Sequence, residues 1–130
     1  MPPQTIRLRG DDPPADATLV VRGGSQSLSD ELLERAAETN RTAFGFWAIS
    51  VFLAPGGDLA ELSQEVPAIR RRRSVRTARC GTLRSAGFPL LDTTRHPLHF
   101  SIVLAELTVS TFDRLRSCFG DPVANPGYRP

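Results

Sequence analysis

The run GFWAISVFL at residues 45–53, which is apolar at nearly every position, constrains the fold most. Aromatic and β-branched residues favour strands, and a strand that is apolar on both sides has to be covered on both sides. The run therefore predicts a central strand rather than an edge strand. A second run, LHFSIVLAEL at residues 98–107, predicts another strand of the same sheet. We expect a common core made of Trp47, Ile49, Val51, Phe100, Ile102 and Leu104.

Three further segments space their apolar residues as amphipathic helices do, namely 27–40, 58–66 and 110–120. Near the start of each segment is a residue type that caps helix N-termini, namely Ser29, Asp58 and Ser110. Shorter strands are predicted at residues 17–21, 74–78 and 82–84. The alternation predicts an α+β fold: a single small sheet of about four to five strands, with two to three helices packed mainly on one face.

The length of 130 residues is that of one domain. Residues 1–16 are rich in proline and acid and are expected to form a flexible N-terminal segment, followed by a single α+β domain over 17–120. Residues 121–130 include three prolines and are expected to form an irregular tail. The start has no secretory signal and no run is long enough to span a membrane, so we expect a cytoplasmic protein that does not contact membranes.

Every one of the 16 basic residues is arginine, and six of them fall within RRRRSVRTAR at residues 70–79. Such a density of cations is typical of a surface that meets RNA, another polyanion or an acidic protein. Arg71, Arg72, Arg73 and Arg76 are therefore predicted to bind anions. The alternative is a solvated charged surface, because the net charge of the chain is only +2.

The stretch VVRGGS at residues 20–25 ends a predicted strand shortly before a predicted helix. Glycines allow backbone N–H groups to approach a phosphate, and the arginine fork can clamp the phosphate oxygens. Arg22, Gly23 and Gly24 are thus a second candidate anion site. The same residues also fit a plain tight turn with a surface arginine.

Both histidines lie in TTRHPLHFSIVL at residues 93–104. Pro97 favours an extended loop at His96, whereas His99 opens the strand with its ring on the Ser101 side. A histidine titrates near neutrality and can act as a general acid or base, so His99 is the candidate catalytic residue. The histidines and the two cysteines have no metal-ligand spacing, so no metal site is predicted.

An arginine, a serine and a glutamate follow one another on successive predicted strands as Arg22, Ser50 and Glu106. This order is similar to that of ADP-ribosyltransferases, in which an arginine and a serine hold NAD and a late glutamate directs transfer. The resemblance implies an alternative transferase site at these three residues. The sequence departs from the family pattern at ISV, which replaces Ser-Thr-Ser, and before Glu106, where the second acidic or glutamine partner is missing.

Three functions of different classes follow from these residues. The first is a metal-independent, toxin-like ribonuclease without a cofactor, in which His99 moves protons, Arg22 holds phosphate and Tyr128 assists. The second is NAD-dependent ADP-ribosyl transfer. The third is a non-enzymatic binding or regulatory module that uses its arginine-rich segment. The sequence defines no oligomeric state.

Overall fold

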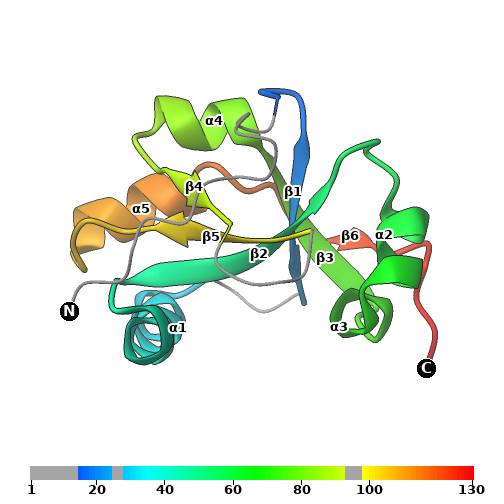
Figure 1. The fold of residues 1–130 in the computed structure, drawn as a ribbon, viewed down its shortest axis with the longest axis horizontal. Helices are drawn as coiled ribbons and strands as arrows, with labels where there is room; N and C mark the ends of the chain where they lie inside the picture. The colour runs from blue at the N-terminus through cyan, green and yellow to red at the C-terminus, as the bar shows by residue number, and fades with distance from the viewer. Residues whose placement is uncertain (1–14, 25–27, 93–97) are drawn as a thin grey trace.

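The computed structural model describes residues 15–24, 28–92 and 98–130, which form one antiparallel sheet and surrounding helices (Figure 1). The strands are β1 (Leu19–Gly23), β2 (Ala48–Ala54), β3 (Ser74–Arg79), β4 (Leu90–Leu91), β5 (His99–Val103) and β6 (Val123–Ala124). The helices are α1 (Asp30–Phe44), α2 (Leu59–Glu65), α3 (Pro67–Arg70), α4 (Cys80–Ser85) and α5 (Val109–Arg116). The α+β class and the single sheet are confirmed. The described sheet has six strands in the order β4-β5-β2-β1-β3-β6, and the described residues form five helices. The predictions of four to five strands and two to three helices were therefore both too low.

Strand β2 lies inside the sheet between β5 and β1, as its apolar run predicts. Its residue Ile49 is 1% exposed and is paired with Ile102 of β5, while Val51 is fully buried and is paired with Phe100. These four residues and Leu104 are buried as expected. Trp47 is only partly buried, because its indole N–H reaches out to the Glu38 carboxylate at 3.0 Å.

Helices cover both faces of the sheet, whereas the sequence had predicted cover mainly on one. Val20 and Val21 are neighbours on β1 and point to opposite faces, and each belongs to a different buried cluster. The Val20 cluster includes residues of α1, α4 and α5, and the Val21 cluster includes residues of α2 and α3. Figure 1 shows α4 and α5 above the strands and α3 below them. Strands that are apolar on both sides require this second layer.

Three of the described helices begin with side-chain caps, and one cap differs from its prediction. Asp58 caps α2 as predicted, because it accepts a hydrogen bond from the Glu61 N–H at 3.1 Å. Ser29 accepts a hydrogen bond from the Leu32 N–H at 3.2 Å, as expected at the start of α1. Helix α5 is capped by Thr108, which accepts from the Thr111 N–H at 3.2 Å, and not by Ser110. Threonine and serine make the same type of cap, so the sequence alone did not choose between the two positions.

Residues 82–84 were predicted as a strand but lie within helix α4. Cys80 and Leu83 are both fully buried, and their spacing of three residues puts them on one face of a helix. The following Gly87 has φ +90°, a left-handed conformation that suits glycine in the turn after the helix.

Both ends of the described chain are bonded to the domain. Asp16 forms an ion pair with Arg84 at 2.7 Å, and its carbonyl accepts from the Gly81 N–H at 2.9 Å. Residues 1–14 of the predicted flexible segment lie outside the described residues. The C-terminal segment, residues 121–130, was expected to be irregular but contains β6, which pairs with β3, and the buried Asn125.

We predict that Ile49→Ala or Ile102→Ala lowers the free energy of unfolding by about 2–5 kcal/mol, because each change leaves a cavity between β2 and its helices. Urea denaturation followed by Trp47 fluorescence measures the loss. Val109→Ala is the control, since Val109 is 62% exposed and should change stability by less than about 0.5 kcal/mol. Losses of the same small size in all three variants would contradict the described core.

Candidate functional site: an arginine pocket

A pocket of about 480 Å³ lies where β1 ends and β3 begins, beside the start of α1. We call it the arginine pocket, and it is lined by Arg22, Gly23, Gly24, Leu28, Leu32, Arg71, Arg72, Arg73, Ser74, Arg76 and Tyr128. It therefore combines the two anion-binding candidates of the sequence, VVRGGS and the arginine run, in one cavity. No carboxylate is found among these described lining residues.

The pairing of β1 with β3 brings two of the arginines face to face. Arg22 and Arg76 are directly opposite in the register, a placement that is unfavourable for like charges. Main-chain carbonyls receive both side chains: Arg22 Nη1 donates to the Ser50 oxygen at 2.9 Å, and Arg76 Nη1 donates to the Gly120 oxygen at 3.2 Å. The carbonyl dipole solvates the Arg22 guanidinium without neutralising its charge, so positive charge persists in the pocket.

Arg22 and Arg76 are the partly buried members of this charged set, and Arg22 is the one whose pKa burial shifts. Burial lowers the pKa of its guanidinium, and the positive charge of Arg72 lowers it further. Arg71, Arg72 and Arg73 are exposed at the pocket rim. Within the described part of the chain, Arg22, Arg71 and Arg72 form no ion pair. Buried charges are normally paired, so an anionic ligand is the missing counter-charge that this arrangement favours.

The two glycines shape the pocket instead of donating to it. A methyl group at Gly23 would lie 2.8 Å from Cγ of Arg72, so only glycine lets the Arg72 side chain cross β1. Gly24 has φ +105°, and its N–H already donates to the Ser74 carbonyl at 2.8 Å. The predicted approach of glycine N–H groups to a phosphate is therefore not available at Gly24.

The loop of Arg71–Arg73, between α3 and β3, is held from beneath by a buried asparagine. Asn125 is 5% exposed, and its Nδ2 donates to the carbonyl oxygens of Ile69 and Arg72, both at 3.0 Å. Its Oδ1 accepts from Ser63 Oγ and from the Gly127 N–H, also at 3.0 Å. Both N–H donors and the oxygen of the side-chain amide are thus hydrogen-bonded. These bonds fix the position of the loop relative to the C-terminal segment.

Tyr128 follows that asparagine and brings an aromatic ring to the pocket. Its hydroxyl accepts from Arg73 Nε at 3.3 Å, and the Arg73 guanidinium lies 5.4 Å from the ring centroid. The hydrogen bond to Tyr128 raises the pKa of Arg73, which keeps this rim arginine charged. The sequence analysis assigned Tyr128 an assisting role, and the structure places it in the pocket lining.

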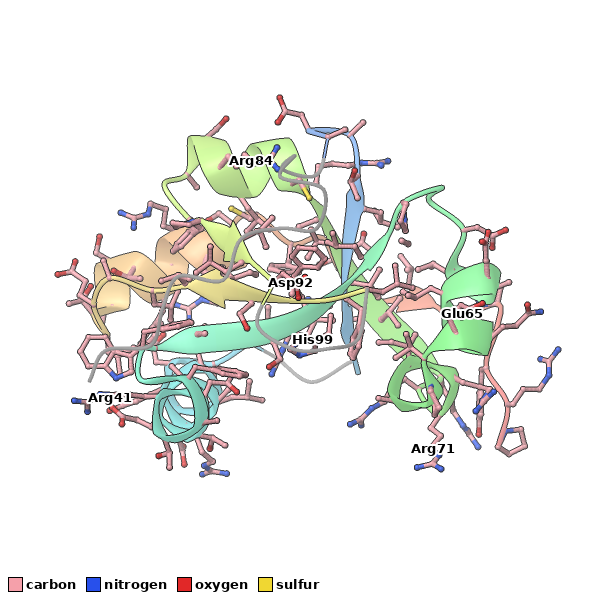
Figure 2. All side chains as sticks on the ribbon, in the orientation of Figure 1. Arg41, Glu65, Arg71, Arg84, Asp92 and His99 are labelled. Atoms are coloured by element: carbon pink, nitrogen blue, oxygen red, sulfur yellow. The ribbon has the colours of Figure 1, made fainter. Side chains whose placement is uncertain are left out.

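His99 is not among the residues that line the arginine pocket. It pairs with Phe52 across β2, and the two rings meet edge to face with centroids 5.1 Å apart. Phe52 pairs in turn with Val21, so His99 lies on the sheet face of Val21, and Arg22 leaves the opposite face. Figure 2 shows His99 at the middle of the sheet and Arg71 projecting from the end of α3. His96 lies outside the described residues.

The alternative transferase set is brought together only in part. Arg22 bonds to the main-chain oxygen of Ser50, while the Ser50 hydroxyl accepts from Asn40 Nδ2 at 3.3 Å. The Glu106 carboxylate accepts from the hydroxyls of Thr108 and Thr111, each at 3.4 Å, near the start of α5. Neither Ser50 nor Glu106 belongs to the lining of the arginine pocket.

Metal and thiol chemistry gain no support from the described residues, where no group of three histidine, cysteine or acidic side chains could hold a metal ion. Cys80 is buried, and burial raises the pKa of its thiol. Burial also raises the pKa of Cys118, which packs against the larger core cluster. Both thiols therefore favour the protonated, unreactive form at neutral pH.

Comparisons with protein-family models, with curated proteins and with solved structures give no match for this chain. Among the helices of the described residues, none has the length and apolar character needed to cross a membrane. The site has to be interpreted from its own geometry.

We predict that Asn125→Ala lowers the free energy of unfolding by about 1–3 kcal/mol. The change removes the hydrogen bonds that the amide donates to the carbonyl oxygens of Ile69 and Arg72. Chemical denaturation measures this loss. Asp121→Ala, an exposed change in the same segment, is the control and should stay within about 0.5 kcal/mol of the wild type. An Asn125→Ala variant as stable as this control would mean that the amide does not hold the loop.

Proposed function

We propose that the protein is a non-enzymatic RNA-binding module that takes RNA phosphate groups into the arginine pocket. The observation that carries the proposal is the convergence of five arginines, one from β1 and four from residues 71–76, on one cavity. Arginine forks match the geometry of phosphate oxygens and stay charged at all physiological pH values. The surrounding rim of exposed arginines adds long-range attraction for a polyanion.

Binding is favoured over cleavage by the position of the proton carriers. Metal-independent RNA cleavage needs a base and an acid near the phosphate that the arginines hold. His99 does not line the pocket, and its ring packs against Phe52. The Tyr128 hydroxyl is engaged by Arg73. The ribonuclease and its His99 mechanism remain predictions, and so does ADP-ribosyl transfer through Arg22, Ser50 and Glu106.

An acidic protein is the other kind of partner that fits a basic pocket. A carboxylate carries one charge and two oxygens, as an internal phosphodiester does, so charge and acceptor number do not separate the two partners. RNA repeats this charge at every nucleotide, which suits the exposed arginines that line the pocket together with the partly buried Arg22.

We predict that Arg71→Ala, Arg72→Ala and Arg73→Ala together weaken binding of a short single-stranded RNA and flatten its salt dependence. Each phosphate contact that is lost should reduce the slope of log K against log salt by about 0.7. Fluorescence anisotropy at several salt concentrations measures both quantities.

The charge-matched control replaces Arg35, Arg41 and Arg114 with alanine, since these arginines do not line the pocket. Its RNA affinity should fall much less than that of the pocket variant, although the net charge is the same. Absence of RNA binding by the wild type at low salt would rule out the proposal. Binding of polyglutamate in place of RNA would favour an acidic protein partner.

We also predict that the wild type leaves an end-labelled RNA intact during prolonged incubation, because no histidine is among the described residues of the pocket. Gel electrophoresis of the labelled RNA gives the answer. The contradicting result is cleavage by the wild type that disappears in His99→Gln, with an unchanged melting temperature. That result would restore the ribonuclease, in which removing a general acid or base costs about 10²–10⁴ in rate.

A further inference from the structure

We infer that the arginine pocket recognises a terminal phosphate of RNA, at a 5′ or 3′ end, in preference to the phosphodiesters within the strand. The inference rests on the proposed function and adds the chemical form of the group that is bound. Three properties of the pocket support it: its supply of charge, its depth and the character of its walls.

The charge of the pocket fits a phosphomonoester better than a phosphodiester. An internal phosphodiester has one negative charge and two free oxygens, whereas a terminal phosphate carries about −1.5 to −2 charges and three free oxygens. Five guanidiniums line the pocket, and Arg22, Arg71 and Arg72 form no ion pair within the described chain. A terminal phosphate offers more acceptors to these donors, and its charge offsets more of the repulsion between Arg22 and Arg72.

The depth of the pocket favours a strand end. Arg22 is partly buried, whereas Arg71, Arg72 and Arg73, which line the same pocket, are exposed. An internal phosphate has a nucleotide on each side, so both flanking nucleotides would have to enter before it reached Arg22. A terminal phosphate has a single ester link, and only that link has to lead out of the cavity. The volume of about 480 Å³ is within the range of pockets that enclose small ligands.

The walls of the pocket fit the nucleoside that follows such a phosphate. Leu28 and Leu32 supply apolar surface from the start of α1. On the other side, Arg73 is held against the Tyr128 ring by the hydrogen bond to the hydroxyl and by the contact at 5.4 Å. A guanidinium fixed in this way presents a planar surface on which an RNA base can stack. The terminal base is thus placed next to the rim, while its phosphate faces Arg22.

The test compares one single-stranded RNA sequence in three forms: with a 5′-phosphate, with a 3′-phosphate and with hydroxyls at both ends. Fluorescence anisotropy is read from a label at the end that is not varied. We expect one terminal phosphate to lower the Kd by about tenfold or more, since it adds charge-assisted hydrogen bonds. The 5′ and 3′ forms show which end the pocket accepts.

Arg22→Gln should reduce this preference to near one, because it removes the charge that only a terminal phosphate reaches. Binding of the hydroxyl-ended RNA should also weaken, because Arg22 lines the pocket, but by less than binding of the phosphorylated RNA. Arg35→Gln is the matched control outside the pocket and should keep the full preference. Circular dichroism melts check the fold, and Arg72→Gln is the second variant if Arg22→Gln is unstable.

Equal affinity for all three RNAs would overturn the inference and leave the proposed function standing. No binding of any RNA would overturn both. A preference that survives in both Arg22→Gln and Arg72→Gln would place the phosphate outside the arginine pocket and overturn the inference. Tighter binding of a phosphoserine peptide than of the phosphorylated RNA would also overturn it, in favour of a phosphoprotein partner.

Discussion

Strand β2 has to be kept from water on both faces, because Ile49 and Val51 are buried on one and Ala48 and Ala54 on the other. A single layer of helices cannot do this, so helices are distributed over both sides of the sheet. Strand β2 pairs with β5 on one edge and with β1 on the other, and β3 pairs with the far edge of β1. The arginines reach their common pocket through this arrangement, although they lie about fifty residues apart in the chain: Arg22 ends β1, and Arg72 precedes β3.

The pocket contradicts the local rules that the rest of the fold obeys. Two arginines face each other across neighbouring strands, a third lies across a glycine, and Arg22 donates to a main-chain carbonyl and forms no ion pair within the described residues. Natural sequences accept such conflicts mainly at functional sites, where a ligand removes the conflict. The polar network beneath the loop has the opposite character, because Asn125 is bonded at both ends of its amide. The loop is therefore held by a fully hydrogen-bonded amide, while Arg71 and Arg72 on it form no ion pair within the described residues. This is the arrangement expected for a preorganised binding site.

Periodicity and capping predicted the elements that are stabilised locally. Helix α1 with its Ser29 cap and the central strands β2 and β5 could be located because burial and hydrogen bonding repeat along these segments. Strand β6 and the short helix α4 could not, since each depends on partners distant in the chain. For the site, composition identified Arg22 and the arginine run as anion binders, but only the β1–β3 register brings them together. Asn125 had no signal of its own, because an asparagine between prolines also fits an exposed turn.

The pairing of β6 with β3 also has a consequence for the order in which the molecule is assembled on the ribosome. Ser74 pairs with Ala124, so the strand that leads out of the arginine loop is synthesised about fifty residues before the strand that completes it. Until Asn125 has left the exit tunnel, the loop has no amide beneath it and the carbonyl groups of Ile69 and Arg72 lack those bonds. The arginines of the pocket are therefore present on the nascent chain before the residues that fix the shape of the pocket have been synthesised.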